Sequence, residues 1–216
     1  MTKKELARIC IDRLKKEYPR SECTLDYDHA WQLLVSVRLA AQCTDARVNV
    51  VVQDLFARYP SVEALAAAEP EEIEAIVKPC GLGRSKARDI SACMRKLRDE
   101  YGGKVPSDFD ALLSLPGVGR KTANCVMCEA FRDPQGIAVD THVFRIAHRL
   151  NFCGPAAKTP EKVEDALLRL YPRDQWLYIN HQWVHFGREF CRAKKPRCSE
   201  CFISDLCPSF PEKDSV

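Results

Sequence analysis

A tight turn between two helices is predicted at Leu115-Pro116-Gly117-Val118-Gly119-Arg120-Lys121-Thr122-Ala123. Two glycines one residue apart let backbone N–H groups point outward with no Cβ in the way, and the helix that follows adds the positive end of its dipole. Such a turn is suited to bind a phosphate. The residues predicted to do so are Gly117, Val118, Gly119 and Arg120. An ordinary turn between helices, without a ligand, is the alternative.

Two common phosphate sites are excluded by the surroundings of this turn. The sequence has no G-x-x-x-x-G-K-[ST], and no strand is predicted before the glycines, so neither a P-loop nor a dinucleotide site fits. A backbone phosphate of DNA is the better ligand, because such contacts position a protein without reading sequence.

The same pattern occurs earlier in the chain, at Gly81-Leu82-Gly83-Arg84-Ser85-Lys86-Ala87, with both glycines, the arginine and the alanine in matching positions. Each copy lies between two segments of helical spacing. They are either two ordinary glycine turns or two copies of one helix–turn–helix device that serve different purposes.

The composition predicts an all-α protein. Of the 216 residues 46% are hydrophobic and 29% charged, which is typical of a soluble globular chain, and glycines number only 9. No segment alternates polar and apolar residues as a strand would. Helices are predicted at residues 3–18, 30–40, 45–56, 63–68, 85–101, 109–114, 120–131, 143–150, 160–170 and 176–186, with a further helix start at 69–72.

The sequence says less about the protein's localisation and partners than about its fold. No apolar run reaches the length of about 18 residues that a membrane span needs, and no signal peptide is recognisable, so we expect a cytosolic protein without a membrane partner. The net charge of +3 does not by itself identify a nucleic-acid binder.

Lys121 and Asp140 are candidate catalytic residues. Lys121 falls in the first turn of the predicted helix, where the positive dipole favours the neutral form of an amine, and a neutral amine is a nucleophile. A solvent-facing lysine that touches phosphate is the alternative. Asp140 follows an apolar run and precedes Thr141-His142, so it is either a helix N-cap or a partner that orients Lys121, takes its proton or stabilises a nearby cation.

Four of the twelve cysteines are clustered near the C-terminus, in the pattern Cys-x6-Cys-x2-Cys-x5-Cys. Zinc is a common partner of four cysteines, but its usual ribbon has two C-x2-C pairs. One compact loop with uneven gaps favours a [4Fe–4S] cluster, and zinc stays open as the alternative. The predicted ligands are Cys191, Cys198, Cys201 and Cys207.

Three of these motifs together resemble the endonuclease III family, bacterial DNA glycosylase/AP lyases of the helix–hairpin–helix superfamily. They are the segment 115–123, Val139-Asp140-Thr141-His142 and the four-cysteine tail. Residues 41–45 are also similar to the family's Ser-Ala-Gln-x-Thr-Asp segment, with Ala40-Ala41 where Ser-Ala is usual. The resemblance implies two helical domains with DNA in the cleft between them: a six-helix module at 23–133, and a domain of 1–22 and 134–216 that carries the cluster.

The resemblance also implies the reaction. Lys121 would attack C1′ of a damaged pyrimidine nucleotide in duplex DNA, and the resulting Schiff base would lead to β-elimination 3′ to the abasic site. Asp140 would help to activate the lysine and stabilise positive charge on the sugar. Gln42 and Leu82 would fill the gap left by the flipped base. The other expected DNA contacts are Gly117, Val118, Gly119, Arg120, Thr141, His142, Arg192, Lys194, Lys195 and Arg197. We expect a monomer in the bacterial cytosol or nucleoid.

Related families and functions are distinguishable. Adenine glycosylases lack the lysine at 121 and carry a catalytic Glu where this chain has Arg38. Mismatch thymine glycosylases commonly have Tyr at 121. The 8-oxoguanine glycosylases usually lack the cluster. Arg38 is therefore expected to face the base pocket or the DNA, or else to extend to the surface. A DNA-binding module that does not cut and a redox protein are the competing functions, and a pure binder would need neither Lys121 nor Asp140.

Overall fold

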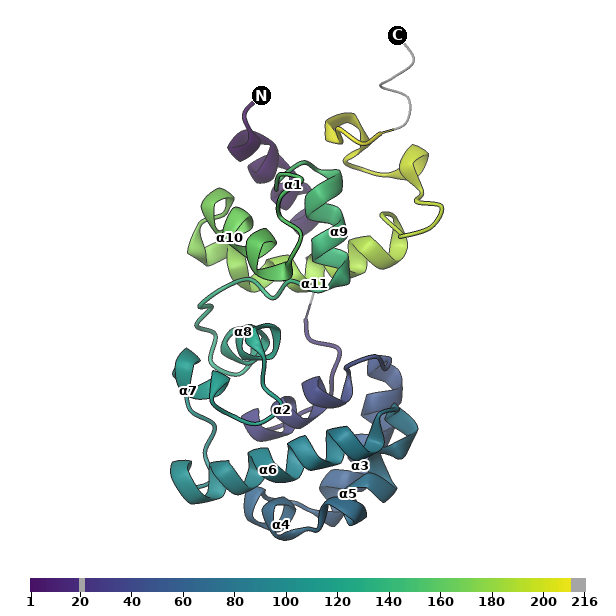
Figure 1. Ribbon diagram of the computed structural model, residues 1–216. Coiled ribbons are helices and arrows are strands. Elements are labelled where there is room, and N and C mark those ends of the chain that lie inside the picture. Colours follow the sequence, from purple (N-terminus) through teal and green to yellow (C-terminus); the bar gives the residue numbers. More distant parts are fainter. Residues whose placement is uncertain (20–21, 211–216) are drawn as a thin grey trace. The chain divides into compact units, whose positions relative to one another are not determined.

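The computed structural model describes residues 1–19 and 22–210, and within them every regular element is a helix (Figure 1). The all-α prediction is confirmed. The chain forms two compact units, which we call the central unit (Cys23–Arg132) and the terminal unit (Met1–Glu22 with Asp133–Val216). Residues 20–21 and 211–216, which belong to the second predicted domain, lie outside the described residues. No helix of the described part is long and apolar enough to cross a membrane.

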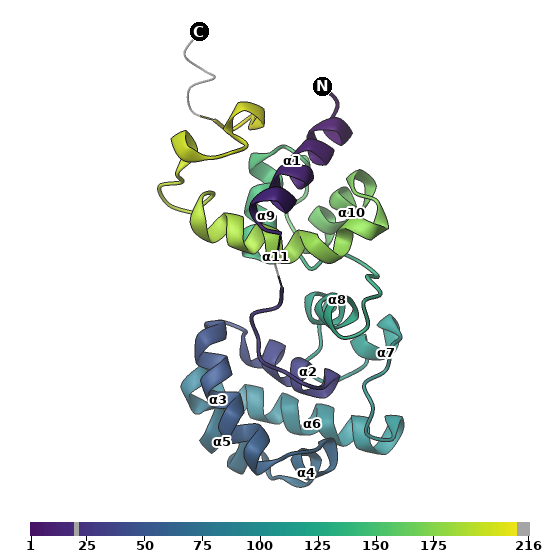
Figure 2. The same cartoon turned by 180° about the vertical axis from the view of Figure 1, so that it is seen from behind.

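The central unit is built around α6, its longest helix. Helices α4 and α5 pack against α6, and α2 contacts both α6 and α8 (Figure 2). We call residues 81–83, which lead into α6, the first glycine turn and residues 117–119, which lead into α8, the second glycine turn. Buried aliphatic side chains fill the space between them, among them Leu33, Leu55 and Leu97. The helices of this unit are α2 (Ala30–Leu39), α3 (Asp45–Arg58), α4 (Val62–Ala67), α5 (Pro70–Val77), α6 (Gly83–Tyr101), α7 (Phe109–Leu113) and α8 (Arg120–Glu129), with a 3₁₀ helix η1 (Lys78–Cys80).

Side-chain caps explain where several of these helices begin. Thr44, Ser61 and Asp108 each accept a hydrogen bond from a backbone N–H in the first turn of the helix that follows. That bond satisfies a donor that has no partner inside the helix. Pro70 stands at the first position of α5, where its missing N–H costs nothing.

The terminal unit joins the two ends of the chain. Its helices are α1 (Lys3–Glu17), α9 (Thr141–Arg149), α10 (Pro160–Leu170) and α11 (Arg173–Glu189), with 3₁₀ helices η2 (Cys198–Glu200) and η3 (Ser204–Leu206). Both α1 and α9 contact α11, so the N-terminal helix packs with the C-terminal half. Trp183 and Phe186 of α11 are buried at the centre of this second core.

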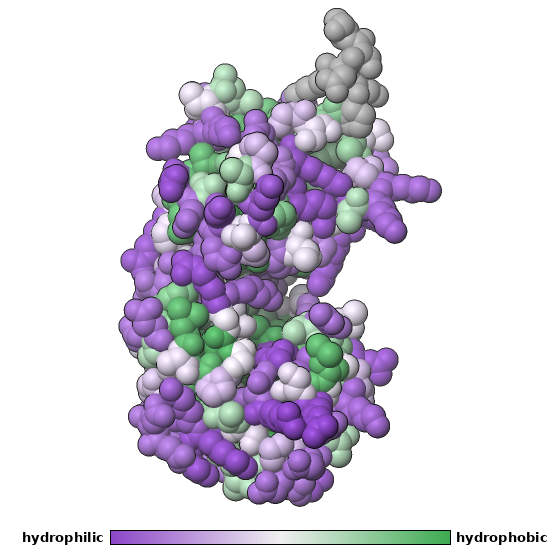
Figure 3. Space-filling view, viewed as in Figure 1, coloured by the Kyte–Doolittle hydropathy of each residue, from purple (hydrophilic) through white to green (hydrophobic). Residues whose placement is uncertain are grey.

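Figure 3 shows one face of the molecule. On the face shown in Figure 3, hydrophilic residues predominate over both units, with smaller hydrophobic patches on the central unit. Leu82 is among the few large hydrophobic side chains that are exposed. An exposed leucine on a turn has no role in the core, so its position needs a separate explanation.

Candidate active site and metal centre

The second glycine turn is shaped by a close contact with α6. Gly117 has φ +75°, and a Cβ at this position would lie 2.8 Å from Cβ of Asp89. Glycine is therefore needed here for its backbone conformation and for space. A Cβ at Gly119, in contrast, would meet nothing within 4 Å, and Gly119 is the N-cap of α8 without a side-chain cap. The backbone at the start of α8 is thus open to solvent, as a phosphate site requires.

The individual phosphate-site residues differ in how they are placed. Gly117, Gly119 and Arg120 are exposed, whereas Val118 is half-buried against the core. The N–H of Val118 already donates to the carbonyl of Leu115 at 3.1 Å. This N–H therefore helps to close the turn itself.

Lys121 is exposed in the first turn of α8, directly behind this turn. The neighbouring Arg120 places its guanidinium over the ring of Phe109, 5.3 Å from the ring centre. Lys121 belongs to the central unit and Asp140 to the terminal unit.

Asp140 is the N-cap of α9. Its Oδ1 accepts hydrogen bonds from the backbone N–H groups of His142 (2.9 Å) and Val143 (2.8 Å). The carboxylate is therefore held in one orientation by the backbone of the helix it caps. The capping alternative is confirmed, and a cap of this kind also fixes the direction of a catalytic group.

His142 and Thr141 follow at the start of α9. Thr141 is exposed, and His142 is half-buried with its Nδ1 3.1 Å from Nη2 of Arg145. Burial lowers the pKa of His142, Asp140 opposes this effect, and Arg145 adds to the lowering. A Cβ at Gly187 would lie 2.5 Å from Nδ1 of His142, so a glycine in α11 makes room for this ring.

The two residues expected to fill the gap in DNA both have an unusual backbone. Gln42 has φ +57° and Leu82 has φ +52°, a conformation that costs a residue with a side chain about 1–2 kcal/mol. Gln42 follows the end of α2, and Leu82 is the N-cap of α6 with 55% of its surface exposed. Strain of this kind is concentrated at functional sites. No sequence signal predicted it.

Arg38 forms an ion pair with a residue of α6. It is half-buried, and its Nε donates to Oδ2 of Asp89 at 2.8 Å. Asp89 is the residue that packs against Gly117, so Arg38 supports the second glycine turn through it. Sequence reasoning missed Asp89 because nothing in its local pattern marks a contact with a distant arginine.

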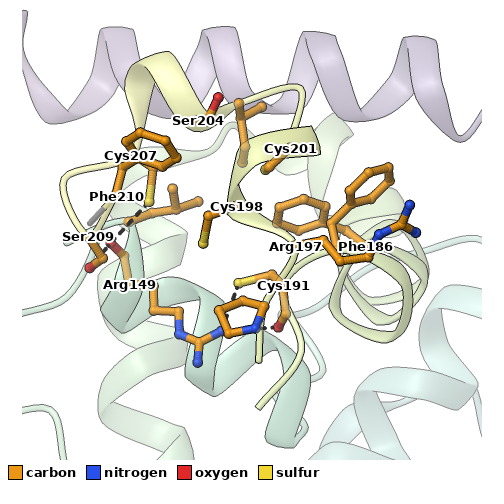
Figure 4. Close-up of a pocket in the computed structure, with 14 residues that line it drawn as sticks. Arg149, Phe186, Cys191, Arg197, Cys198, Cys201, Ser204, Cys207, Ser209 and Phe210 are labelled. Carbon is orange, nitrogen blue, oxygen red and sulfur yellow. Dashed lines mark hydrogen bonds between the residues drawn. The ribbon is translucent and has the colours of Figure 1, made fainter. Parts of the chain in front are cut away.

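The four clustered cysteines line one cavity of about 230 Å³ (Figure 4). Nη1 of Arg149 donates to Sγ of Cys191 at 3.2 Å and to the carbonyl of Arg192 at 2.7 Å. Phe186 and Phe190 line the same cavity. Four thiols in a partly apolar cavity, with a guanidinium as hydrogen-bond donor to one sulfur, are a suitable donor set for an iron–sulfur cluster.

The four basic residues between Cys191 and Cys198 differ in how accessible they are to a ligand. Arg192, Lys194 and Lys195 are exposed. Arg197 is bonded to Glu200, and its guanidinium lies 5.3 Å from the ring centre of Phe190. Arg197 is therefore the least available of the four cations for an external phosphate.

Comparisons with known proteins agree with these features. The family model described as "HhH-GPD superfamily base excision DNA repair protein" matches residues 35–173, and "Iron-sulfur binding domain of endonuclease III" matches residues 191–207. The chain is 44% identical to endonuclease III of Synechocystis sp., covering 96% of this chain and 94% of that relative. It is 42% identical to endonuclease III of Bacillus subtilis, with 95% and 93% covered.

Solved structures give the same result. A trapped endonuclease III–DNA covalent intermediate has a TM-score of 0.92 and 41% identity, and covers 99% of this chain and 100% of that one. A thermostable thymine-DNA glycosylase has a TM-score of 0.84 and 25% identity, with 95% and 97% covered. The chain therefore belongs to the endonuclease III family of the HhH-GPD superfamily, and is a DNA glycosylase and AP lyase that carries a [4Fe–4S] cluster.

Proposed function

We propose that this enzyme removes oxidised pyrimidines from duplex DNA and cuts the strand 3′ to the abasic site, with Lys121 as the nucleophile. The observation that carries the proposal is the position of Lys121. It is an exposed lysine in the first turn of α8, directly after a glycine turn whose backbone is open to solvent. A phosphate held at this turn would bring the sugar of the same strand close to the amine.

The reaction would proceed through a Schiff base. The neutral amine of Lys121 attacks C1′, the bond from C1′ to the base breaks, and the electron pair leaves with the base, which takes up a proton. The sugar ring opens to an imine between Nζ and C1′. Loss of a proton from C2′ then expels the phosphate at C3′, which cuts the strand.

Asp140 is proposed as the second catalytic residue. Its carboxylate is oriented by two backbone hydrogen bonds at the start of α9. A fixed negative charge stabilises the cationic sugar that forms as the base leaves, and a carboxylate can accept the proton that the attacking amine releases.

Gln42 and Leu82 are proposed to fill the gap left when the base is flipped out. Both are exposed on turns with positive φ, so their side chains project from the ends of helices rather than pack in the core. An apolar side chain inserted into a base step offsets part of the lost stacking. Leu82 would act in this way, and Gln42 would add a polar contact.

The proposed phosphate contacts come from three segments: Gly117–Arg120 of the second glycine turn, Thr141 and His142 at the start of α9, and the loop that carries Arg192, Lys194, Lys195 and Arg197. Cys191, Cys198, Cys201 and Cys207 are the proposed cluster ligands. The bound cluster would cross-link a segment that has little regular structure of its own. The basic residues between these cysteines would thereby be presented to DNA. We propose that the enzyme acts as a monomer in the bacterial cytosol.

Borohydride trapping tests the proposal. Sodium borohydride reduces an imine to a stable amine, so an enzyme caught as a Schiff base stays attached to its DNA. We expect a trapped band on a duplex with one thymine glycol for the wild type and for Lys104→Ala, a control at an exposed lysine of the same unit. We expect no band for Lys121→Ala. A band that persists in Lys121→Ala would contradict the assigned nucleophile, and base release without any band would contradict the lyase mechanism.

A further inference from the structure

Lys86 is a buried lysine that the proposed reaction does not use. It lies in the first turns of α6, and its side chain is 0% exposed. Its ammonium donates to the carbonyl oxygens of Leu39 and Cys80, each at 2.8 Å. Burying a charge is costly unless it is hydrogen-bonded, so an ammonium held by two main-chain carbonyls needs a reason to be there.

The two carbonyls belong to the ends of two different helices. Leu39 is the last residue of α2, and Cys80 is the last residue of η1. The final carbonyls of a helix have no partner inside it and carry its partial negative charge, which a cation neutralises. One ammonium therefore joins two helix ends that are 41 positions apart in the chain, the difference between residues 80 and 39.

Each of these helix ends leads directly into one of the two strained turns. Gln42, with φ +57°, lies three residues after Leu39, and Leu82, with φ +52°, lies two residues after Cys80. The backbone N–H of Lys86 also donates to the carbonyl of Leu82 at 3.0 Å. Lys86 thus bonds to the residues before and after Gly81 in the Leu82 turn. It also bonds to the last residue of α2, which leads into the Gln42 turn.

We propose that Lys86 is a positioning residue that fixes the Gln42 and Leu82 turns relative to each other, so that both side chains enter the duplex together. This inference rests on the proposed roles of Gln42 and Leu82. Two side chains that fill one gap must be a set distance apart, and two strained turns hold their conformation only when the surrounding structure fixes them. The ammonium provides a direct link between them.

The test compares two substrates that differ in their need for these turns. Base removal from a duplex requires the gap to be filled, whereas cleavage of an abasic site in single-stranded DNA leaves no gap in a stack. For each variant we would measure the ratio of the two activities, because a change in the folded fraction cancels in the ratio. The variants are Lys86→Met and Leu97→Ala, a control that removes buried volume from the same helix at a position 11 residues after Lys86.

We expect Lys86→Met to lower the duplex to single-strand ratio by about 100-fold, as a misplacement of the order of 1 Å can do, and Leu97→Ala to leave it unchanged. In a Leu82→Gly background Lys86→Met should lower the ratio much less, because the side chain to be positioned is already absent. The proposal is overturned if the ratio is unchanged in Lys86→Met, if it falls equally in Leu97→Ala, or if both activities of Lys86→Met disappear together. Failure of the wild type to be trapped on the thymine glycol duplex would instead contradict the role of Lys121.

Discussion

The two glycine turns of the central unit share both glycines, an arginine and an alanine, but their lysines stand one position apart. Lys121 is two residues after the second glycine of its turn, and Lys86 is three residues after the second glycine of the other. One residue rotates a side chain by about 100° around a helix. That shift separates an exposed lysine, Lys121, from a completely buried one, Lys86.

The glycines of the two turns also differ in why they are needed. Gly81 and Gly117 both have positive φ, so the first glycine serves the backbone in each copy. The second glycines differ. A Cβ on Gly83 would lie 3.1 Å from Cα of Lys78, whereas a Cβ on Gly119 would meet nothing within 4 Å. The first turn is packed from behind and presents a side chain, Leu82. The second presents its backbone. The same pattern thus suits the insertion that we propose for Leu82 in one copy and the phosphate contact that we propose for the other.

The largest effect on stability is expected from the buried lysine. Lys86→Met leaves two buried carbonyls without their donor, which should lower the free energy of unfolding by about 2–4 kcal/mol. Lys121→Met changes an exposed side chain and should stay within about 0.5 kcal/mol of the wild type. Urea unfolding at neutral pH measures both. Equal effects of the two substitutions would show that the one-residue shift does not separate their roles.

A somewhat smaller loss of stability is expected from a substitution in the second glycine turn. Gly117→Ala forces a side chain into positive φ and against Asp89, so it should destabilise the protein by about 1–3 kcal/mol. Gly119→Ala meets open space and should change stability by no more than about 0.5 kcal/mol. Thermal unfolding of the two variants side by side provides the measurement, and a larger loss for Gly119→Ala would contradict the assigned geometry.

Substitution of the middle residue should mainly lower activity in the first glycine turn and mainly lower stability in the second. Leu82→Ala removes an exposed side chain, so stability should be retained while excision from duplex DNA falls about tenfold, or about 1.4 kcal/mol of transition-state stabilisation. Val118→Ala removes a side chain packed on the core but keeps the backbone of the turn, so it should cost about 1 kcal/mol of stability and lower excision per folded molecule less than Leu82→Ala does. Single-turnover excision and urea unfolding test the pair, and the reverse assignment of the two effects would refute it.

The smallest effect is a pH dependence. Burial lowers the pKa of Lys86, so the folded protein releases this proton at a lower pH than the unfolded chain, whose lysines titrate near about 10.4. Between these two values the unfolded chain binds more protons, and stability gained from Lys86 rises with pH. The stability difference between wild type and Lys86→Met should therefore grow as the pH rises through this alkaline range. A flat or falling difference would show that the ammonium is not penalised by burial.

The sequence predicted what depends on local spacing. Helical periodicity and composition identify an all-α chain, and the glycine turn before Lys121 and the cap at Asp140 follow from residues that are close in sequence. The first helical residues are less well predicted: α6 begins at Gly83 rather than residue 85, and α11 at Arg173 rather than residue 176. The cause lies in the flanking turns, since the backbone of Leu82 and Pro172 already sets the first turn of each helix.

Contacts between distant residues were not predictable in this way. Lys86 has the sequence context of an exposed helical lysine, and only the folded chain brings the ends of α2 and η1 to its ammonium. The ion pair of Arg38 was not predicted, because its partner, Asp89, is on another helix. The positive φ of Gln42 and Leu82 has the same origin, since tertiary packing maintains a conformation that neither residue type prefers.

The most direct test of the account is to locate the covalent bond. Wild-type protein would be reduced with borohydride on a duplex that carries a single thymine glycol, digested with a protease, and analysed by mass spectrometry for the lysine that bears the sugar. We predict that the sugar is attached to Nζ of Lys121, the exposed lysine that follows the second glycine turn. Attachment to Lys86, to Lys194 or Lys195, or to the N-terminal amine would contradict it.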